Sequence, residues 1–163
     1  MSSKEISELS AARGRRRLTA EIRELLRELS VQLSVLNHLV GARVDLRPVD
    51  LNCLDVIGRH GPLSPSGLAQ HTGLHPATLT GILDRLERAG WIARDRHPSD
   101  RRAVMVRSLP DRAGEIFRLY GGMNAGLEEV LGGFDDRQLR TLADFLRRAT
   151  DAGRAASNEL ARP

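Results

Sequence analysis

The sequence contains little cysteine and few aromatic residues, and both shortages limit what the chain can be. Cys53 is the one cysteine among 163 residues, which excludes an intramolecular disulfide and is typical of proteins from a reducing cytoplasm. Aromatic side chains make up 3% of the sequence, so aliphatic side chains must provide most of the buried surface, as packed helices allow. No apolar run approaches the roughly 20 residues of a membrane span, and the first residues lack the apolar segment of a signal peptide. We therefore expect a soluble, cytoplasmic protein with no membrane partner.

The residue groupings typical of enzymes and metal sites are missing as well. The sequence shows no Ser/His/Asp set, no glycine-rich phosphate loop and no close pair of carboxylates. The histidines lie in different predicted elements at spacings that do not suit a metal ion, and they are His38, His60, His71, His75 and His97. We therefore expect no enzyme activity, no metal ion and no cofactor. For Cys53 two interpretations stay open, an inert core thiol on an inward helix face or a sensor of oxidants.

Positive charge is concentrated in two blocks of a chain whose net charge is +4. Residues 1–17 carry five basic and two acidic side chains, and residues 64–108 carry seven basic and four acidic ones, which gives each block a net charge of +3. The blocks 18–63 and 109–163 have a net charge of −1 each. This distribution favours a phosphate-rich partner for residues 64–108. Residues 1–17 are predicted to form a basic flexible arm, which either contacts phosphates or is simply solvated.

Residues 64–90 are predicted to form two short helices joined by a tight turn. Ser64 can cap the first helix, Pro65 suits its first position, and Gly73 can adopt the positive φ that the turn requires. Apolar residues recur at the offsets that a helix-turn-helix needs, namely Leu68, Ala69, Leu74, Leu79, Ile82, Leu83 and Leu86. The outer face of the second helix carries small, hydroxyl and arginine groups, which suit the major groove of DNA.

A β-hairpin is predicted directly after these helices. The β-prone runs 91–93 and 103–106 enclose a loop rich in arginine. Guanidinium groups on such a loop, beside a recognition helix, can enter the minor groove, where the negative potential is concentrated. We therefore interpret residues 64–108 as a winged helix-turn-helix that binds double-stranded DNA.

Long helices are predicted on both sides of this unit. Apolar residues repeat every three or four positions over 18–44, 49–60, 110–130 and 135–153, and residues 154–163 form a tail. The third of these helices contains Gly121, Gly122 and Gly126, which are unfavourable inside a helix. Either close packing against another helix or a kink would explain them. The first and last helices leave apolar stripes that the small winged unit cannot cover alone. The expected fold class is therefore mainly α with a small β-wing, in which long terminal helices flank the winged helix-turn-helix.

The segments 74–92 and 100–104 resemble the winged helix of the MarR family of bacterial transcriptional regulators. The resemblance covers residues 18–153 and implies dimerisation helices at 18–46 and 110–153 around a DNA-binding part at 47–109. It implies a homodimer on a palindromic operator, and a wing in which Asp100 orients Arg102 toward the minor groove. The predicted DNA-binding residues are Ser64, Ser66, His75, Ala77, Thr78, Thr80, Gly81, Arg85, Arg94, Arg96, Asp100, Arg101 and Arg102. A ligand cleft is expected at His38, Ile57, His60 and Met123.

The sequence departs from the family pattern at three places. Gly81 stands where many relatives have an arginine, His75 replaces the usual capping serine, and Leu109-Pro110 replaces a Leu-Thr pair. The operator sequence is therefore expected to differ from the common one. The function that we predict is a sequence-specific transcriptional repressor released from DNA by a small-molecule effector. An activator, a winged-helix module for protein contact and a nonspecific architectural DNA binder remain as alternatives.

Overall fold

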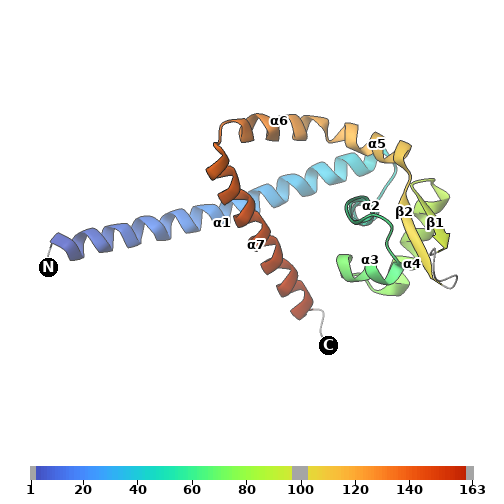
Figure 1. Cartoon of the computed structure of the whole chain (residues 1–163), viewed down its shortest axis with the longest axis horizontal. Helices are drawn as coiled ribbons and strands as arrows, with labels where there is room; N and C mark the ends of the chain where they lie inside the picture. The colour runs from blue at the N-terminus through green and yellow to red at the C-terminus, as the bar shows by residue number, and fades with distance from the viewer. Residues whose placement is uncertain (1–2, 97–102, 161–163) are drawn as a thin grey trace.

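The computed structural model describes residues 3–96 and 103–160, in which helices predominate (Figure 1). The described elements are α1 Ser3–Arg43, α2 Pro48–His60, α3 Pro65–Thr72, α4 Pro76–Arg88, β1 Ile92–Arg96, β2 Val104–Ser108, α5 Pro110–Leu119, α6 Gly121–Gly132 and α7 Asp136–Leu160. Elements α2 to β2 form the winged helix-turn-helix, and α1 and α5 to α7 extend from it. The predicted fold class is confirmed. Within the described residues, no helix is long and apolar enough to cross a membrane.

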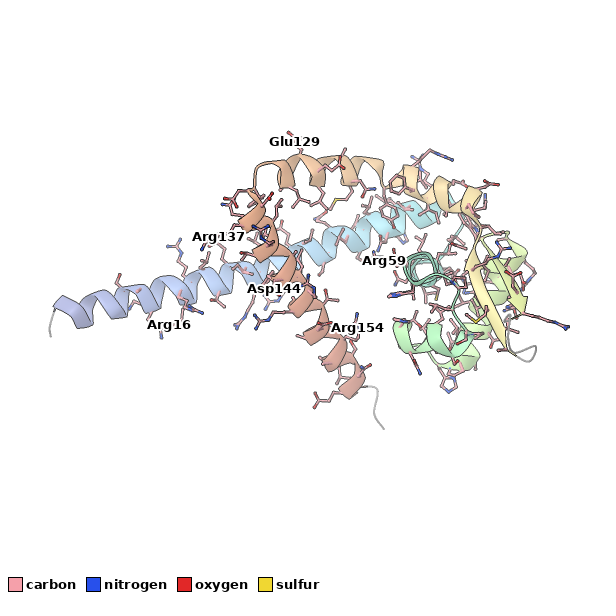
Figure 2. The ribbon with its side chains drawn as sticks, in the orientation of Figure 1. Arg16, Arg59, Glu129, Arg137, Asp144 and Arg154 are labelled. Carbon is pink, nitrogen blue, oxygen red and sulfur yellow. The ribbon has the colours of Figure 1, made fainter. Side chains whose placement is uncertain are left out.

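The terminal helices are longer than the sequence analysis predicted. Helix α1 begins at Ser3 rather than near residue 18, so residues 3–17, which we assigned to a flexible arm, continue the same helix. Helix α7 continues to Leu160, through most of the predicted tail. On the outside of these helices stand charged side chains such as Arg16, Asp144 and Arg154 (Figure 2). Local propensity explains both extensions, because the added segments contain no proline and several good helix formers.

The predicted helix over 110–130 is divided into two helices. Helix α5 ends at Leu119, and α6 begins at Gly121. Nothing lies within 4 Å of a Cβ placed on Gly121, Gly122 or Gly126. Close packing within the described chain therefore does not explain these glycines. Gly121 and Gly122 stand at the break, whereas Gly126 lies inside α6 and has no structural explanation. The Tyr120 hydroxyl at the break donates a hydrogen bond of 2.7 Å to Oδ1 of Asn37 on α1.

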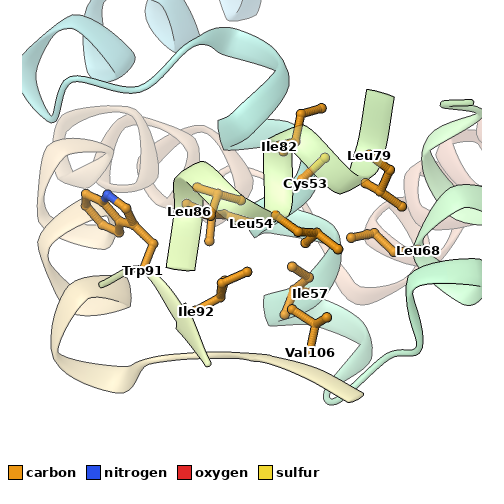
Figure 3. Packing of buried hydrophobic residues seen from close by; sticks show 11 residues of the cluster. Cys53, Leu54, Ile57, Leu68, Leu79, Ile82, Leu86, Trp91, Ile92 and Val106 are labelled. Carbon is orange, nitrogen blue, oxygen red and sulfur yellow. The ribbon is translucent and has the colours of Figure 1, made fainter. Parts of the chain in front are cut away.

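The core lies where α2, α3, α4 and the two strands meet (Figure 3). Its buried members are Cys53, Leu54, Ile57, Leu68, Leu79, Ile82, Leu83, Leu86, Trp91, Ile92 and Val106. Every apolar residue that we predicted for the inward face of α4 is among them. Burial of these aliphatic side chains, each worth about 1.5–3 kcal/mol, supplies the stability of this part of the fold.

The two strands form an antiparallel hairpin, in which Ile92 pairs with Ser108 and Arg96 pairs with Val104. Leu63, just before α3, adds a further bridge to the sheet. Its N–H donates to the Val106 carbonyl at 3.0 Å, and its carbonyl accepts from the Val106 N–H at 2.7 Å. This contact fixes the start of the helix-turn-helix against the wing. Sequence reasoning could not predict this bridge, because a single residue between two helices has no β pattern.

Apolar side chains remain exposed along the flanking helices, where globular proteins normally bury them. Leu25 and Leu29 of α1, Val130 of α6 and Leu146 of α7 have between 44% and 61% of their surface exposed. Five of the exposed residues on α1 repeat at intervals of three and four and so form one stripe along the helix, namely Leu18, Ile22, Leu25, Leu29 and Leu33. A stripe of this kind is typical of a surface that another protein chain covers.

Candidate nucleic-acid interface

The recognition helix α4 is fixed at its start by a histidine cap. Nδ1 of His75 accepts a hydrogen bond of 3.3 Å from the backbone N–H of Ala77, and Pro76 occupies the first helical position. The imidazole of His75 therefore caps the helix, a role that a serine hydroxyl has more commonly. To act as an acceptor, Nδ1 must be unprotonated. This departure from the family pattern does not prevent the helix from starting at the predicted residue.

The outward face of α4 carries small and hydroxyl-bearing side chains. His75, Ala77, Thr78 and Thr80 are exposed, and Gly81 is half-buried. The Thr80 hydroxyl donates to the Pro76 carbonyl at 3.0 Å, and its oxygen can still accept a bond from a base or donor group. A helix face of this size can approach base edges in the major groove closely, because no long side chain keeps it away.

The start of α3 offers two further polar groups beside this face. Oγ of Ser64 accepts a hydrogen bond of 3.1 Å from the Gly67 N–H and lies 3.0 Å from Oγ of Ser66. Ser64 therefore has a structural role as the helix cap, while Ser66 is exposed. Pro65 has no N–H, and the N–H groups of Gly67 and Leu68 bond to Ser64, so the hydroxyl and backbone N–H of Ser66 are the groups here that can bind a backbone phosphate.

Arg85 does not lie on the outward face where the sequence analysis placed it. Its Nη2 forms an ion pair of 2.7 Å with Oδ1 of Asp50, and its Nη1 donates to the Gly81 carbonyl at 3.1 Å. The Asp50 side chain is only 4% exposed and also accepts a long hydrogen bond of 3.4 Å from the Arg47 N–H. A buried carboxylate needs such a partner, which explains why the arginine turns inward. Arg85 thus connects the recognition helix to α2.

Arg94 is likewise turned away from the tip of the wing. Its Nη2 lies 2.7 Å from Oδ1 of Asp84, and its Nη1 lies 2.8 Å from Oε2 of Glu87. Both carboxylates belong to α4, so one guanidinium holds strand β1 against the recognition helix. The two carboxylates compete with phosphate for this side chain. The position therefore fits a role in orienting the wing better than the predicted DNA contact.

Of the remaining predicted wing residues, Arg96 lies in the described part of the structure. Arg96, at the end of β1, is exposed and can reach a partner. Asp100, Arg101 and Arg102 lie outside the described residues, so their predicted roles stay predictions. Across the hairpin, Arg107 pairs with Asp95 at 2.6 Å.

The base of the wing is attached to the helix that follows it. The Arg112 guanidinium lies 3.8 Å from the centre of the buried Trp91 ring, in a cation–π contact. Nη1 of Arg112 also pairs with Glu115 at 2.8 Å, and the Trp91 carbonyl accepts from the Leu109 N–H at 3.0 Å. The wing is thereby connected to α5 as well as to α4.

The four residues predicted to line a ligand cleft are not brought together. Ile57 is 1% exposed and belongs to the core. The ring of His60 stacks on that of His71, with 4.2 Å between centroids. His38 is exposed and Met123 is half-buried, near the contact between Tyr120 and Asn37. A pocket of about 530 Å³ opens elsewhere in the described chain, between the end of α1 and the last turn of α4.

Cys53 is fully buried beside the ion pair of α2 and α4. Burial, and then the negative charge of Asp50, raise the pKa of its thiol from 9.0 to about 11. The thiolate is the reactive form, so this cysteine is almost entirely unreactive near neutral pH. Its environment therefore supports the interpretation as a core thiol over that as an oxidant sensor.

Comparison with known proteins agrees with this geometry. Residues 46–104, which contain the winged helix, match the sequence profile of the MarR family. This match supports a MarR-family winged-helix regulator. Proteins of that family are non-enzymatic DNA-binding regulators of transcription.

Relatives cover most of the chain. The chain is 27% identical over 143 residues to the uncharacterized HTH-type transcriptional regulator YcgE of Bacillus subtilis. This alignment covers 88% of this chain and 93% of YcgE. It is 27% identical over 90 residues to the HTH-type transcriptional repressor YetL of Bacillus subtilis, about half of each chain (53% and 54%). The structure of a MarR family protein from Bacillus stearothermophilus aligns with a TM-score of 0.65 at 25% identity, over 84% of this chain and 96% of that one.

Proposed function

We propose that this MarR-family chain is a homodimeric repressor that binds a palindromic operator and is released from it by a small molecule. The observation that carries the proposal is the outward face of α4. It presents Thr78, Thr80 and Ala77 to solvent at the start of a helix whose opposite face is buried in the core. Side chains of this size near the helix start are the ones that contact base edges when such a helix enters the major groove.

The ion pairs around α4 support a role in reading sequence. Arg85 connects α4 to Asp50 on α2, and Arg94 connects it to β1 through Asp84 and Glu87. A recognition helix that is held on two sides keeps its side chains in place, so little entropy is lost when they contact bases. Discrimination between operators requires this precision, whereas nonspecific attraction to phosphates does not.

The exposed apolar stripe supports the homodimer. Leu25 of α1 is 56% exposed and Leu146 of α7 is 52% exposed in the single chain. A second copy with the same stripe can cover both helices through a two-fold axis, the commonest symmetry of homodimers. Such a dimer places its two recognition helices about 34 Å apart, one turn of DNA, and a palindromic operator then matches the symmetry of the protein.

Repression is supported by a relative rather than by geometry. The related YetL is named as a repressor, and we transfer that sign of regulation to this chain. An activator would use the same DNA-binding surface, so the direction of regulation needs its own measurement. Because its partner is chromosomal DNA, we place the protein in the cytoplasm.

The experiment that tests the proposal is footprinting on the DNA that flanks the protein's own gene, followed by gel shifts. We expect one protected palindrome, bound at least 10³ times more tightly than random DNA. Thr78→Ala should weaken operator binding while leaving random-DNA binding unchanged. The matched control is Thr141→Ala on α7, whose hydroxyl bonds the Arg137 carbonyl of its own helix.

The alternatives give other results in the same experiment. A dimer that contacts roughly 6–10 phosphates should lose about 10³–10⁵ in affinity between 50 and 200 mM salt. A steep salt dependence without preference for any palindrome indicates an architectural DNA binder. No DNA binding at any salt concentration indicates a winged helix used for protein contact, and either result contradicts the proposal.

A further inference from the structure

The N-terminal part of α1 extends away from the rest of the chain. Residues 10–17 are helical and exposed throughout. Figure 1 shows no other described element beside this end of the helix. The core does not use this segment, and neither does the outward face of α4. Its side chains are therefore available to a partner from outside the chain.

This segment carries a dense positive charge. Residues 9–20 contain no aspartate or glutamate and four arginines, namely Arg13, Arg15, Arg16 and Arg17. Among the side chains that the structure describes, the first arginine of α1 with a carboxylate partner is Arg27, which pairs with Glu24. Arg13 and Arg17 stand four positions apart, where like charges repel each other across one helical turn. A polyanion bound to this segment would remove that repulsion.

Three of these arginines lie on the side of α1 that a second copy of the chain leaves uncovered. At 3.6 residues per turn, Arg13, Arg16 and Arg17 share one face of the helix. The apolar stripe from Leu18 to Leu33 follows the opposite face. In the single chain, Arg16 stands clear of the other described elements (Figure 2). A partner chain that covers the stripe therefore leaves these guanidinium groups in solvent.

The composition of the segment favours a phosphate backbone as its partner. Residues 10–17 contain only serine, alanine, glycine and arginine. A helix that lies on a membrane or in a groove of another protein inserts large apolar side chains, which this segment does not have. Its cations are all arginines, whose planar guanidinium groups bind two phosphate oxygens at once. Nucleic acid is therefore the partner that these side chains fit.

The length of α1 allows these arginines to reach DNA outside the operator. Arg13 and Arg17 precede Arg43, the last residue of α1, by 30 and 26 positions. These separations correspond to about 39–45 Å along the helix axis. In the proposed dimer the two half-sites are about 34 Å apart. The arginines thus lie farther from their own winged unit than the second half-site does, so we take the duplex beyond the ends of the operator as their partner.

We propose that Arg13, Arg16 and Arg17 form a second DNA contact, in which α1 binds the phosphates of the duplex that flanks the operator. The inference rests on the proposed function, since it adds a contact without sequence preference to the operator complex. Once the recognition helices are bound, the flanking DNA is held near these arginines, which raises its effective concentration. Each phosphate contact releases counterions, so the gain in affinity decreases as salt is added.

The experiment compares two operator duplexes in gel shifts at about 100 mM salt. One duplex ends at the outer edges of the palindrome, and the other continues for about 20 base pairs on each side, at roughly 3.4 Å per base pair. The wild-type protein should bind the longer duplex about tenfold more tightly. The triple variant Arg13→Gln, Arg16→Gln and Arg17→Gln should bind both duplexes with the wild-type affinity for the short one. Glutamine has good helix propensity, so α1 should persist, and circular dichroism checks this.

The matched control removes the same amount of charge from another helix. Arg137, Arg140 and Arg147 are exposed on α7. Their joint replacement by glutamine should leave the preference for the longer duplex unchanged. A control variant that loses this preference to the same extent would show that net charge alone produces it, and this result overturns the inference.

The salt dependence of binding to the longer duplex supplies a second measurement. Each phosphate contact contributes about 0.9 to the slope of log affinity against log salt concentration, so the slope should be shallower for the triple variant by at least about 2. The inference is overturned if the wild-type protein binds both duplexes equally, if the triple variant keeps the preference, or if the triple variant loses affinity for both duplexes by the same factor.

Failure to bind any operator counts against the proposed function instead. A random duplex of the longer length then tests the arginines alone. The triple variant should bind that duplex more weakly than the wild-type protein and with a shallower salt slope. Equal binding of the random duplex by both proteins overturns the inference in that case.

Discussion

Replacement of Arg85 by methionine should destabilise the fold, although the residue lies on the recognition helix. The change keeps a long side chain but leaves the carboxylate of Asp50, only 4% exposed, without its cation 2.7 Å away. Removal of one partner of a buried ion pair costs about 3–5 kcal/mol. Because the Arg85 side chain is 36% exposed, solvent screens part of this loss, and we expect about 2–3 kcal/mol.

The magnitude can be measured by urea denaturation at one fixed protein concentration, since the proposed dimer would make the apparent stability concentration-dependent. In a thermal melt, a loss of this size corresponds to a fall in Tm of roughly 5–10 °C for a chain of this length. Asp50→Asn alone should cost less, about 1 kcal/mol, because the half-buried Arg85 keeps partial access to water. The double variant should recover about 1–2 kcal/mol relative to the sum of the single changes.

The double variant also distinguishes the structural role of Arg85 from a DNA contact. If Arg85 contacted DNA, Arg85→Met would lower operator affinity without altering stability, and Asp50→Asn would not restore anything. Strictly additive effects of the two substitutions on the free energy of unfolding would refute the reasoning about the buried pair.

Four other outcomes are expected. Thr78→Ala should reduce operator affinity about tenfold in gel shifts and leave affinity for random DNA unchanged, since only base contacts are lost. Leu25→Asp should dissociate or unfold the protein in sedimentation experiments, because an unpaired carboxylate in an apolar interface costs several kcal/mol; a stable DNA-binding dimer would contradict the proposed interface. Gly41→Ala should lower the free energy of unfolding, because the new methyl would lie 2.5 Å from the Leu46 carbonyl oxygen. Because burial raises the pKa of Cys53 to about 11, its thiol should resist alkylation at pH 8 until urea unfolds the chain. The free energy of unfolding should decrease as the pH rises above 9, because the thiol then ionises in the unfolded chain but not yet in the folded one.

The sequence predicted the winged helix well because its signals are local. The cap at Ser64, the glycine turn at Gly73 and the inward stripe from Leu79 to Leu86 each depend on neighbours a few residues away, and each has the predicted role. Periodicity therefore identified the elements and most of the core.

The functional assignments of the arginines were less accurate because ion pairs are set by tertiary distance. Arg85 and Arg94 follow the outward or loop pattern in the sequence, yet the carboxylates they bind lie 35 and 10 positions away. One feature of the sequence could have indicated that Arg85 pairs with a buried carboxylate. Asp50 stands in the first turn of a helix between apolar positions, and a carboxylate there has to find a cation if it is buried.

The unbroken course of α1 gives the proposed dimer a mechanical property. At 1.5 Å per residue, its 41 residues make a rod of about 60 Å, one end of which is packed against the winged core at Val40 and Gly41. If such a rod turns by about 5° around one end, its far end moves by roughly 5 Å. A change of angle at the turn that follows Gly41 would therefore move the far ends of α1 and, in the proposed dimer, would change the separation of the two recognition helices.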